Sequence, residues 1–199
     1  MKRSLIAIDA PVAAILFANI AALSTAWIAG WGLGELFRLY WIELVAVGVV
    51  AFFQIRSARR PGALAKSRGY QGIFFVAHFG TFCVAYGALL SSILDERWEV
   101  EPLFWLVVMI PAAALAGAHV IVYRVDFLRR EAAFVSSMEA MFLPYLRVLP
   151  VQTPLVVAAA ILPANISGPS AAILFALGKT VADLATYVVR RRRIDPDRT

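Results

Sequence analysis

The chain has 199 residues, of which 61% are hydrophobic and only 16% are charged, and its mean hydropathy is +0.77. Soluble domains contain roughly 45–50% apolar and about 25% charged residues, so this composition excludes an ordinary water-soluble fold. The formal charge of +6 does not indicate nucleic-acid binding, because the basic residues lie at the ends of apolar runs rather than on one face interleaved with aromatic residues.

Apolar runs long enough to cross a bilayer recur along the whole chain. A helical span needs about 20 residues, and spans must be helical here because lipid offers no partner to the backbone and no alternating strand pattern indicates a barrel. We therefore predict an all-α, polytopic membrane helix bundle that forms a single transmembrane domain over residues 1–199. Its six predicted spans are 11–30, 36–55, 70–94, 102–123, 151–167 and 170–189.

The first span has a second interpretation. Lys2 and Arg3 precede the apolar run and small residues follow it near Ala26, a pattern that also occurs in cleaved signal peptides. The run is long for the apolar part of a signal peptide, so we favour a membrane span. Cleavage would leave the orientation of the other five spans unchanged.

Lysines and arginines are divided very unevenly between the two sides of the predicted bundle. With the N-terminus placed in the cytoplasm, sixteen of them fall on the inner side and two, Arg38 and Arg97, on the outer side. Positive residues favour the cytoplasmic side, and an even number of spans returns the chain to that side. The distribution therefore predicts cytoplasmic termini and a multi-pass protein of the inner (cytoplasmic) membrane.

The inner connection before the fifth span is the longest. Its apolar residues gather on one side of a helical wheel and its arginines on the other, which predicts an amphipathic helix over about 126–147 on the inner surface. There its arginines would meet anionic lipids, although a helix packed under the bundle is an equal alternative. The apolar side consists of Leu128, Val135, Met138, Phe142, Tyr145, Leu146 and Leu149.

Ionisable residues inside the spans are the main candidates for function. Such residues are costly in lipid and ordinarily face the bundle interior, where they pair with one another. Lys179 and Asp183 are four apart and share one helical face, which predicts an ion pair, and Glu43 lies at a depth that lets it join Lys179. The five candidates are Glu43, His78, His119, Lys179 and Asp183.

Two interpretations of these residues stay open from the sequence. A transition metal could be bound by His78 and His119 together with Glu43 and Asp183. Two histidines on separate helices could also be the axial ligands of haem. The alternative is that both histidines only make structural hydrogen bonds. Lys179 and Asp183 suit either a structural ion pair or a proton or ion relay. No HExxH, GxSxG, P-loop, CxxC or dinucleotide motif occurs, so the pattern names no catalytic residue.

Four short motifs stand out, namely Tyr40–Glu43, Phe74–Gly80 with Phe82, Pro144–Arg147, and Lys179–Thr180 followed by Asp183. Together they resemble a family of multi-pass bacterial and archaeal membrane proteins known only as a domain of unknown function. The resemblance implies a shared membrane fold and a polar site built from the five candidates, and it supplies no activity. It also implies that relatives often carry histidines where this chain has Gln152 and Tyr187, so a metal site of relatives would be altered here.

The sequence thus leaves three hypotheses for function. The first is a membrane protein whose buried His, carboxylate and Lys residues bind a metal or haem. The second is a small proton- or ion-coupled transporter, and the third is a structural or assembly subunit of a membrane complex. We expect the bilayer itself as a partner, together with a second copy of the chain or another membrane subunit.

Overall fold

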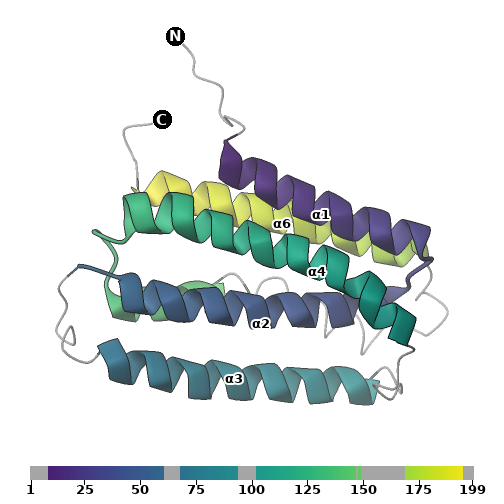
Figure 1. The fold of residues 1–199 in the computed structure, drawn as a ribbon, viewed down its shortest axis with the longest axis horizontal. Coiled ribbons are helices and arrows are strands. Elements are labelled where there is room, and N and C mark those ends of the chain that lie inside the picture. Colours follow the sequence, from purple (N-terminus) through teal and green to yellow (C-terminus); the bar gives the residue numbers. More distant parts are fainter. Residues whose placement is uncertain (1–8, 61–67, 94–101, 147, 149–168, 195–199) are drawn as a thin grey trace, which may run out of the picture.

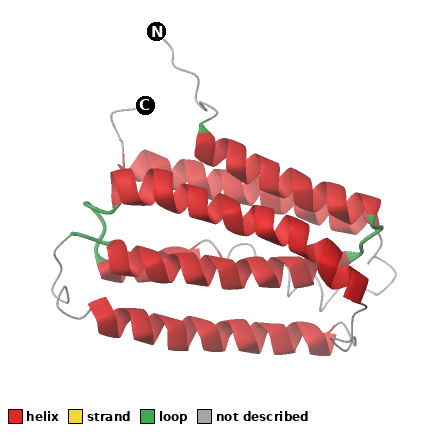
Figure 2. Cartoon of the chain, viewed as in Figure 1, coloured by secondary structure: helices red, strands yellow, loops and turns green. Residues whose placement is uncertain are grey.

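The computed structural model describes residues 9–60, 68–93, 102–146, 148 and 169–194. Every regular element in this part of the chain is a helix (Figure 2). A further short helix covers 137–146. The main elements are α1 (Ala10–Ile28), α2 (Leu33–Ser57), α3 (Arg68–Ile93), α4 (Pro102–Val122), the π-helix η2 (Tyr123–Glu131) and α6 (Pro169–Ile194).

Within the described residues, five helical segments are long and apolar enough to cross a membrane, which confirms the all-α fold class. Their outward faces carry large apolar side chains, such as Phe17 at 69% and Ile28 at 83% exposure, as a lipid-facing surface requires. The predicted span at 151–167 lies outside the described residues. The five segments are Ala10–Ile28, Leu33–Ser57, Gly69–Ser92, Phe104–Glu131 and Ala172–Arg191.

The helices lie side by side with α2 in the middle (Figure 1). α2 packs against α3, α4 and α6, while α1 packs against α4 and α6 on the other side of the bundle. α3 lies at the edge and packs mainly against α2. α2 therefore carries the interior face on which a site shared by several helices can form.

Local sequence sets both ends of α1. The Asp9 side chain accepts a hydrogen bond from the Val12 N–H at 3.3 Å and caps the first turn. At the other end Gly30 adopts a φ of +66°, and the Trp31 N–H donates to the Ala26 carbonyl at 2.8 Å. This is the Schellman arrangement, which favours glycine because a side chain is strained at positive φ.

Glycines let α2 and α3 approach closely. A Cβ on Gly48 of α2 would lie 2.7 Å from Phe79 Cε1 of α3, and one on Gly87 of α3 would lie 2.9 Å from Trp41 Nε1 of α2. The Trp41 N–H donates to the Cys83 carbonyl at 2.8 Å. We call this contact the glycine–aromatic interface, and it fixes α3 at the edge of the bundle.

The predicted helix over 126–147 is wrong as a single element. Its first part continues the fourth span, because α4 runs on through η2 to Glu131. The chain turns at 132–136, where the Arg59 and Arg60 N–H groups donate to the carbonyls of Ala132 and Val135. Residues 137–146 then form a separate helix.

The helix at 137–146 packs against the bundle on one side and is exposed on the other. Tyr145, near its end, packs against Phe75 and Phe79 of α3, which lie two to three turns inside that helix. Ala140 is fully buried. Met138, Phe142 and Leu146 of the predicted apolar side are exposed, whereas Tyr145 contacts α3. The position of this helix at the membrane surface stays a prediction.

Candidate buried charge cluster

Four ionisable side chains from three helices meet in the interior of the bundle. α2 supplies Glu43, α4 supplies His119, and α6 supplies Lys179 and Asp183, and each of the four is between 4% and 6% exposed. α1 adds the buried amide of Asn19. We refer to these five side chains as the buried cluster.

The carboxylate of Glu43 is the centre of the buried cluster. Its Oε1 atom lies 2.9 Å from both His119 Nε2 and Lys179 Nζ, and its Oε2 atom lies 2.7 Å from Lys179 Nζ. An ionised carboxylate only accepts hydrogen bonds, so His119 Nε2 carries the proton of this bond when Glu43 is charged. The imidazole and the ammonium group thus share one acceptor.

Lys179 joins the two carboxylates of the cluster. Its Nζ atom lies 2.7 Å from Asp183 Oδ2, one turn along the same helix. The same atom lies 4.8 Å from the centre of the Tyr40 ring, which is 1% exposed. A desolvated cation over an aromatic face gains roughly 2 kcal/mol. The three N–H groups of Lys179 therefore face two carboxylates and an aromatic ring.

Asn19 connects the cluster to α1. Its Nδ2 atom donates to the Ile15 carbonyl at 2.9 Å and to Asp183 Oδ2 at 3.4 Å. Its Oδ1 atom is buried and accepts no hydrogen bond from the described residues. The position of Asn19 beside Asp183 comes from the packing of α1 against α6.

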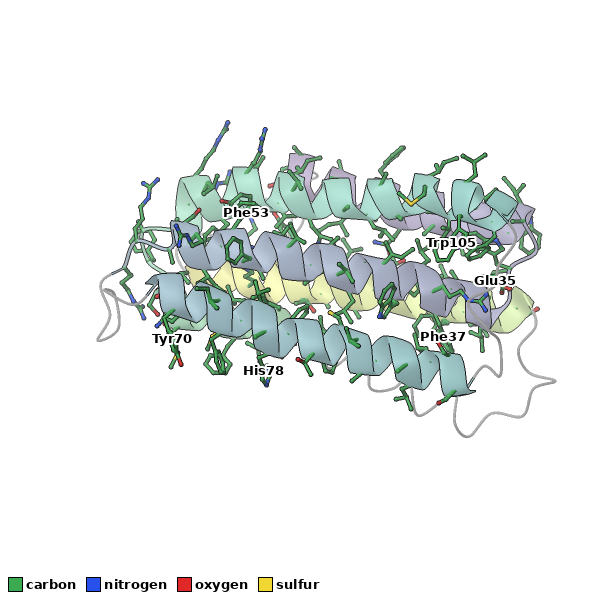
Figure 3. All side chains as sticks on the ribbon, turned by 60° about the horizontal axis from the view of Figure 1, so that its bottom comes forward. Glu35, Phe37, Phe53, Tyr70, His78 and Trp105 are labelled. Carbon is green, nitrogen blue, oxygen red and sulfur yellow. The ribbon has the colours of Figure 1, made fainter. Side chains whose placement is uncertain are left out.

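His78 lies apart from the buried cluster. Its side chain is on an exposed face of α3, where Nδ1 lies 2.7 Å from the Tyr145 hydroxyl and the ring stacks on Phe74 (Figure 3). The predicted set of His78, His119, Glu43 and Asp183 is therefore divided between two places. Within the described residues, no three His, Cys, Asp or Glu side chains are grouped so that they could hold a metal ion.

The comparisons with known proteins place the chain in a family but give no activity. The family of unknown function DUF6498 matches residues 1–199, the full length of the sequence. The chain belongs to this family. No curated protein and no solved structure matches it.

This DUF6498 protein also has a second polar network, at the end of the bundle where α1 begins and α6 ends. The Tyr187 hydroxyl donates to Asp126 Oδ2 at 2.8 Å, and Arg130 lies 3.3 Å from Asp126 Oδ1. Arg190 Nε donates to Glu131 at 2.9 Å, and Arg191 pairs with Asp9 at 2.5 Å. We call this set the terminal network.

The terminal network of this DUF6498 member was not predicted, because its acidic residues lie outside the predicted spans. Asp126 and Glu131 are five residues apart, which on an α-helix places them on different faces. In the π-helix η2 hydrogen bonds join residues five apart, so both carboxylates face inward and are 5% exposed. The available signal was the presence of Asp126 and Glu131 in a segment that also contains Arg124, Arg129 and Arg130.

Proposed function

We propose that the buried cluster is an intramembrane proton-exchange site and that the protein couples proton movement to transport across the membrane. One observation carries the proposal: continuous contacts join His119, Glu43, Lys179 and Asp183 across three helices. Ionisable residues inside spans commonly mark ion pathways and proton relays. A proton is the ion that such a chain of donors and acceptors transfers most directly.

The charge of the cluster supports a proton as the exchanged ion. Glu43 and Asp183 contribute two negative charges when ionised, Lys179 contributes one positive charge, and a neutral His119 contributes none, so these four sum to −1. One additional proton, on the imidazole or on a carboxylate, brings the sum to zero. Because a buried net charge is destabilising, the site favours uptake of that proton.

The proposal is tested first by measuring protonation directly. In infrared difference spectra of the reconstituted protein across a pH change, we expect carboxyl and imidazole bands that report one exchanging proton. Glu43→Gln should remove the carboxyl band and His119→Gln the imidazole band. Glu35→Gln is the matched control, because Glu35 caps the first turn of α2 by accepting from the Gly32 N–H, which an amide oxygen can also do.

The second measurement is proton flux into liposomes that contain a pH-sensitive dye. We expect Glu43→Gln to lower the flux about a hundredfold, near the lower end of what a positioned proton-transfer group contributes. Protonation bands without any flux above protein-free liposomes would contradict the transport part of the proposal. Spectra without bands that depend on Glu43 would contradict the proton-exchange site itself and favour a structural role.

A further inference from the structure

His78 is a polar residue on the outward face of a helix that can cross the membrane. The spanning part of α3 is Gly69–Ser92, and His78 lies within about 4 Å of its middle along the helix axis. The side chain is nevertheless exposed (Figure 3). Ionisable residues at this depth ordinarily face the interior of a bundle or water. The imidazole therefore needs a polar partner that does not come from the bundle itself.

Tyr145 orients the imidazole and leaves one of its nitrogen atoms available. The Tyr145 hydroxyl lies 2.7 Å from His78 Nδ1. When this hydroxyl donates, the hydrogen of the neutral ring is on Nε2. Among the described residues, none makes a hydrogen bond with Nε2. Nε2 therefore offers an N–H donor outside the bundle, and a second helix holds it in place.

Aromatic rings lie beside this donor. The His78 ring stacks on Phe74 with an angle of 16° between the two planes, and the ring centres of Phe142 and Tyr145 are 6.5 Å apart. Both phenylalanines are about half exposed. A single oriented polar group beside accessible aromatic rings is typical of a site for a small apolar molecule whose polar atoms are few.

We propose that His78, Phe74 and Tyr145 form a binding site for a lipid-soluble quinone, in which His78 Nε2 donates to a ring carbonyl. Depth distinguishes the candidate ligands. The ester and phosphate groups of phospholipids stay at the surfaces of a hydrocarbon layer about 30 Å thick, so they do not reach His78. A hydrocarbon tail reaches it but accepts no hydrogen bond. A quinone brings carbonyl groups on an apolar ring to this depth.

The experiment uses the two histidines of the chain as reporters. In NMR spectra of reconstituted protein with isotope-labelled histidine, decylubiquinone should shift the Nε2 signal of His78 until the site is saturated. The signal of His119 in the buried cluster should not move, and His78→Gln assigns the two signals. Decylbenzene has the same tail and an aromatic ring but no carbonyl, so it should not cause the shift.

Tyr145→Phe keeps the ring and removes the hydroxyl that orients His78. We expect the affinity for decylubiquinone in the same titration to fall about fivefold, the effect of one lost hydrogen bond, while the His119 signal shows that the fold is intact. Tyr123→Phe is the matched control, because the Tyr123 hydroxyl faces Ser57 of α2 at 2.8 Å, and it should leave the affinity unchanged.

Three results would each overturn the quinone site. They are a His78 signal that does not move, an equal shift with decylbenzene, and an affinity that is the same in Tyr145→Phe as in the wild type. A His78 signal that responds to protein concentration and not to decylubiquinone would assign this surface to a second copy of the chain instead. The buried cluster takes no part in the site, so these results leave the proposed proton exchange untouched.

Discussion

Lys179 is the residue on which the stability of the buried cluster depends most directly. It is the only positively charged member when His119 is neutral, and it contacts both carboxylates within 2.9 Å. Removing one partner of a buried ion pair leaves an uncompensated charge, whereas removing charge from both partners is much less harmful. The charge balance therefore contributes more to the stability of the buried cluster than any single contact does.

Replacement of Lys179 should show this balance. We expect Lys179→Met to lower the free energy of unfolding by about 3–5 kcal/mol, because two buried carboxylates lose their shared cation. Glu43→Gln added to Lys179→Met should recover much of that loss. The measurement is reversible unfolding in detergent micelles, and a double variant no more stable than Lys179→Met would contradict the argument.

Hydropathy could predict which ionisable residues lie inside the apolar spans, but not which of these residues contact one another. Glu43, His119, Lys179 and Asp183 stood out because charge inside an apolar run is costly, and the structure brings these four together. His78 had the same signal, yet its helix lies at the edge and its imidazole contacts Tyr145. The position of a residue along its span follows from the sequence, whereas tertiary packing determines whether its side chain faces the interior of the bundle.

At the scale of the element, the glycine–aromatic interface explains why α3 packs on α2 at all. Gly48→Ala would place a methyl group 2.7 Å from Phe79 Cε1, so the aromatic ring must move. Overpacking of this kind costs about 1–3 kcal/mol. We expect a corresponding loss of stability, measured by unfolding in micelles.

Gly80→Ala is the control for this prediction. Gly80 is also in the middle of a span, but a Cβ there meets nothing within 4 Å. Alanine is the better helix former, so this variant should be as stable as the wild type or slightly more stable. Equal destabilisation by both substitutions would show that helix flexibility, and not the contact with Phe79, is the cause.

The helix at 137–146 should respond to pH through its cap. The hydrogen bond from the Ser136 N–H holds the pKa of Glu139 below its ordinary value of 4.5. The Ser136 hydroxyl and Arg60 lower this pKa as well, whereas partial burial opposes the shift. A lowered pKa in the folded state means that the contact stabilises the helix above pH 4.5 and is lost as the pH falls through the lower, folded value. The protection factors of the amides in the first turn, which are corrected for the intrinsic pH dependence of hydrogen exchange, should therefore fall on acidification.

Glu139→Gln tests that assignment, because an amide does not titrate. This variant should have lower protection factors at neutral pH, and these factors should not fall further between neutral and acidic conditions. An acid response that survives in Glu139→Gln would assign the effect to another group. The spacing of Ser136 and Glu139 is also the sequence signal that could have predicted where this helix begins. It was not used, because the apolar pattern predicted one continuous helix over 126–147.

At the scale of the whole molecule, the two ends of the bundle differ in composition. The end where α1 begins carries the terminal network and most of the described arginines, and the opposite end carries Trp27, Trp31 and Trp105. Asp9 and Arg191 pair there, so α1 begins and α6 ends on the same side. We propose that this basic side faces the cytoplasm.

Labelling with a membrane-impermeant thiol reagent tests the orientation. The chain has one cysteine, the buried Cys83, so single cysteines are introduced into a Cys83→Ala background. We expect Ile28→Cys, at the tryptophan end, to react in intact cells and Phe134→Cys, at the basic end, to react only after permeabilisation. The reverse pattern would place the basic side outside.

The distance along the chain between Glu43 and its cation has a consequence for synthesis. The two residues are separated by 136 positions, so at about 5–20 residues per second Glu43 leaves the ribosome roughly 7–27 s before Lys179. During that interval the carboxylate lacks the lysine that balances it. A chain that stops before α6 therefore retains an uncompensated acid in lipid, a defect by which quality control can distinguish unfinished protein from finished protein.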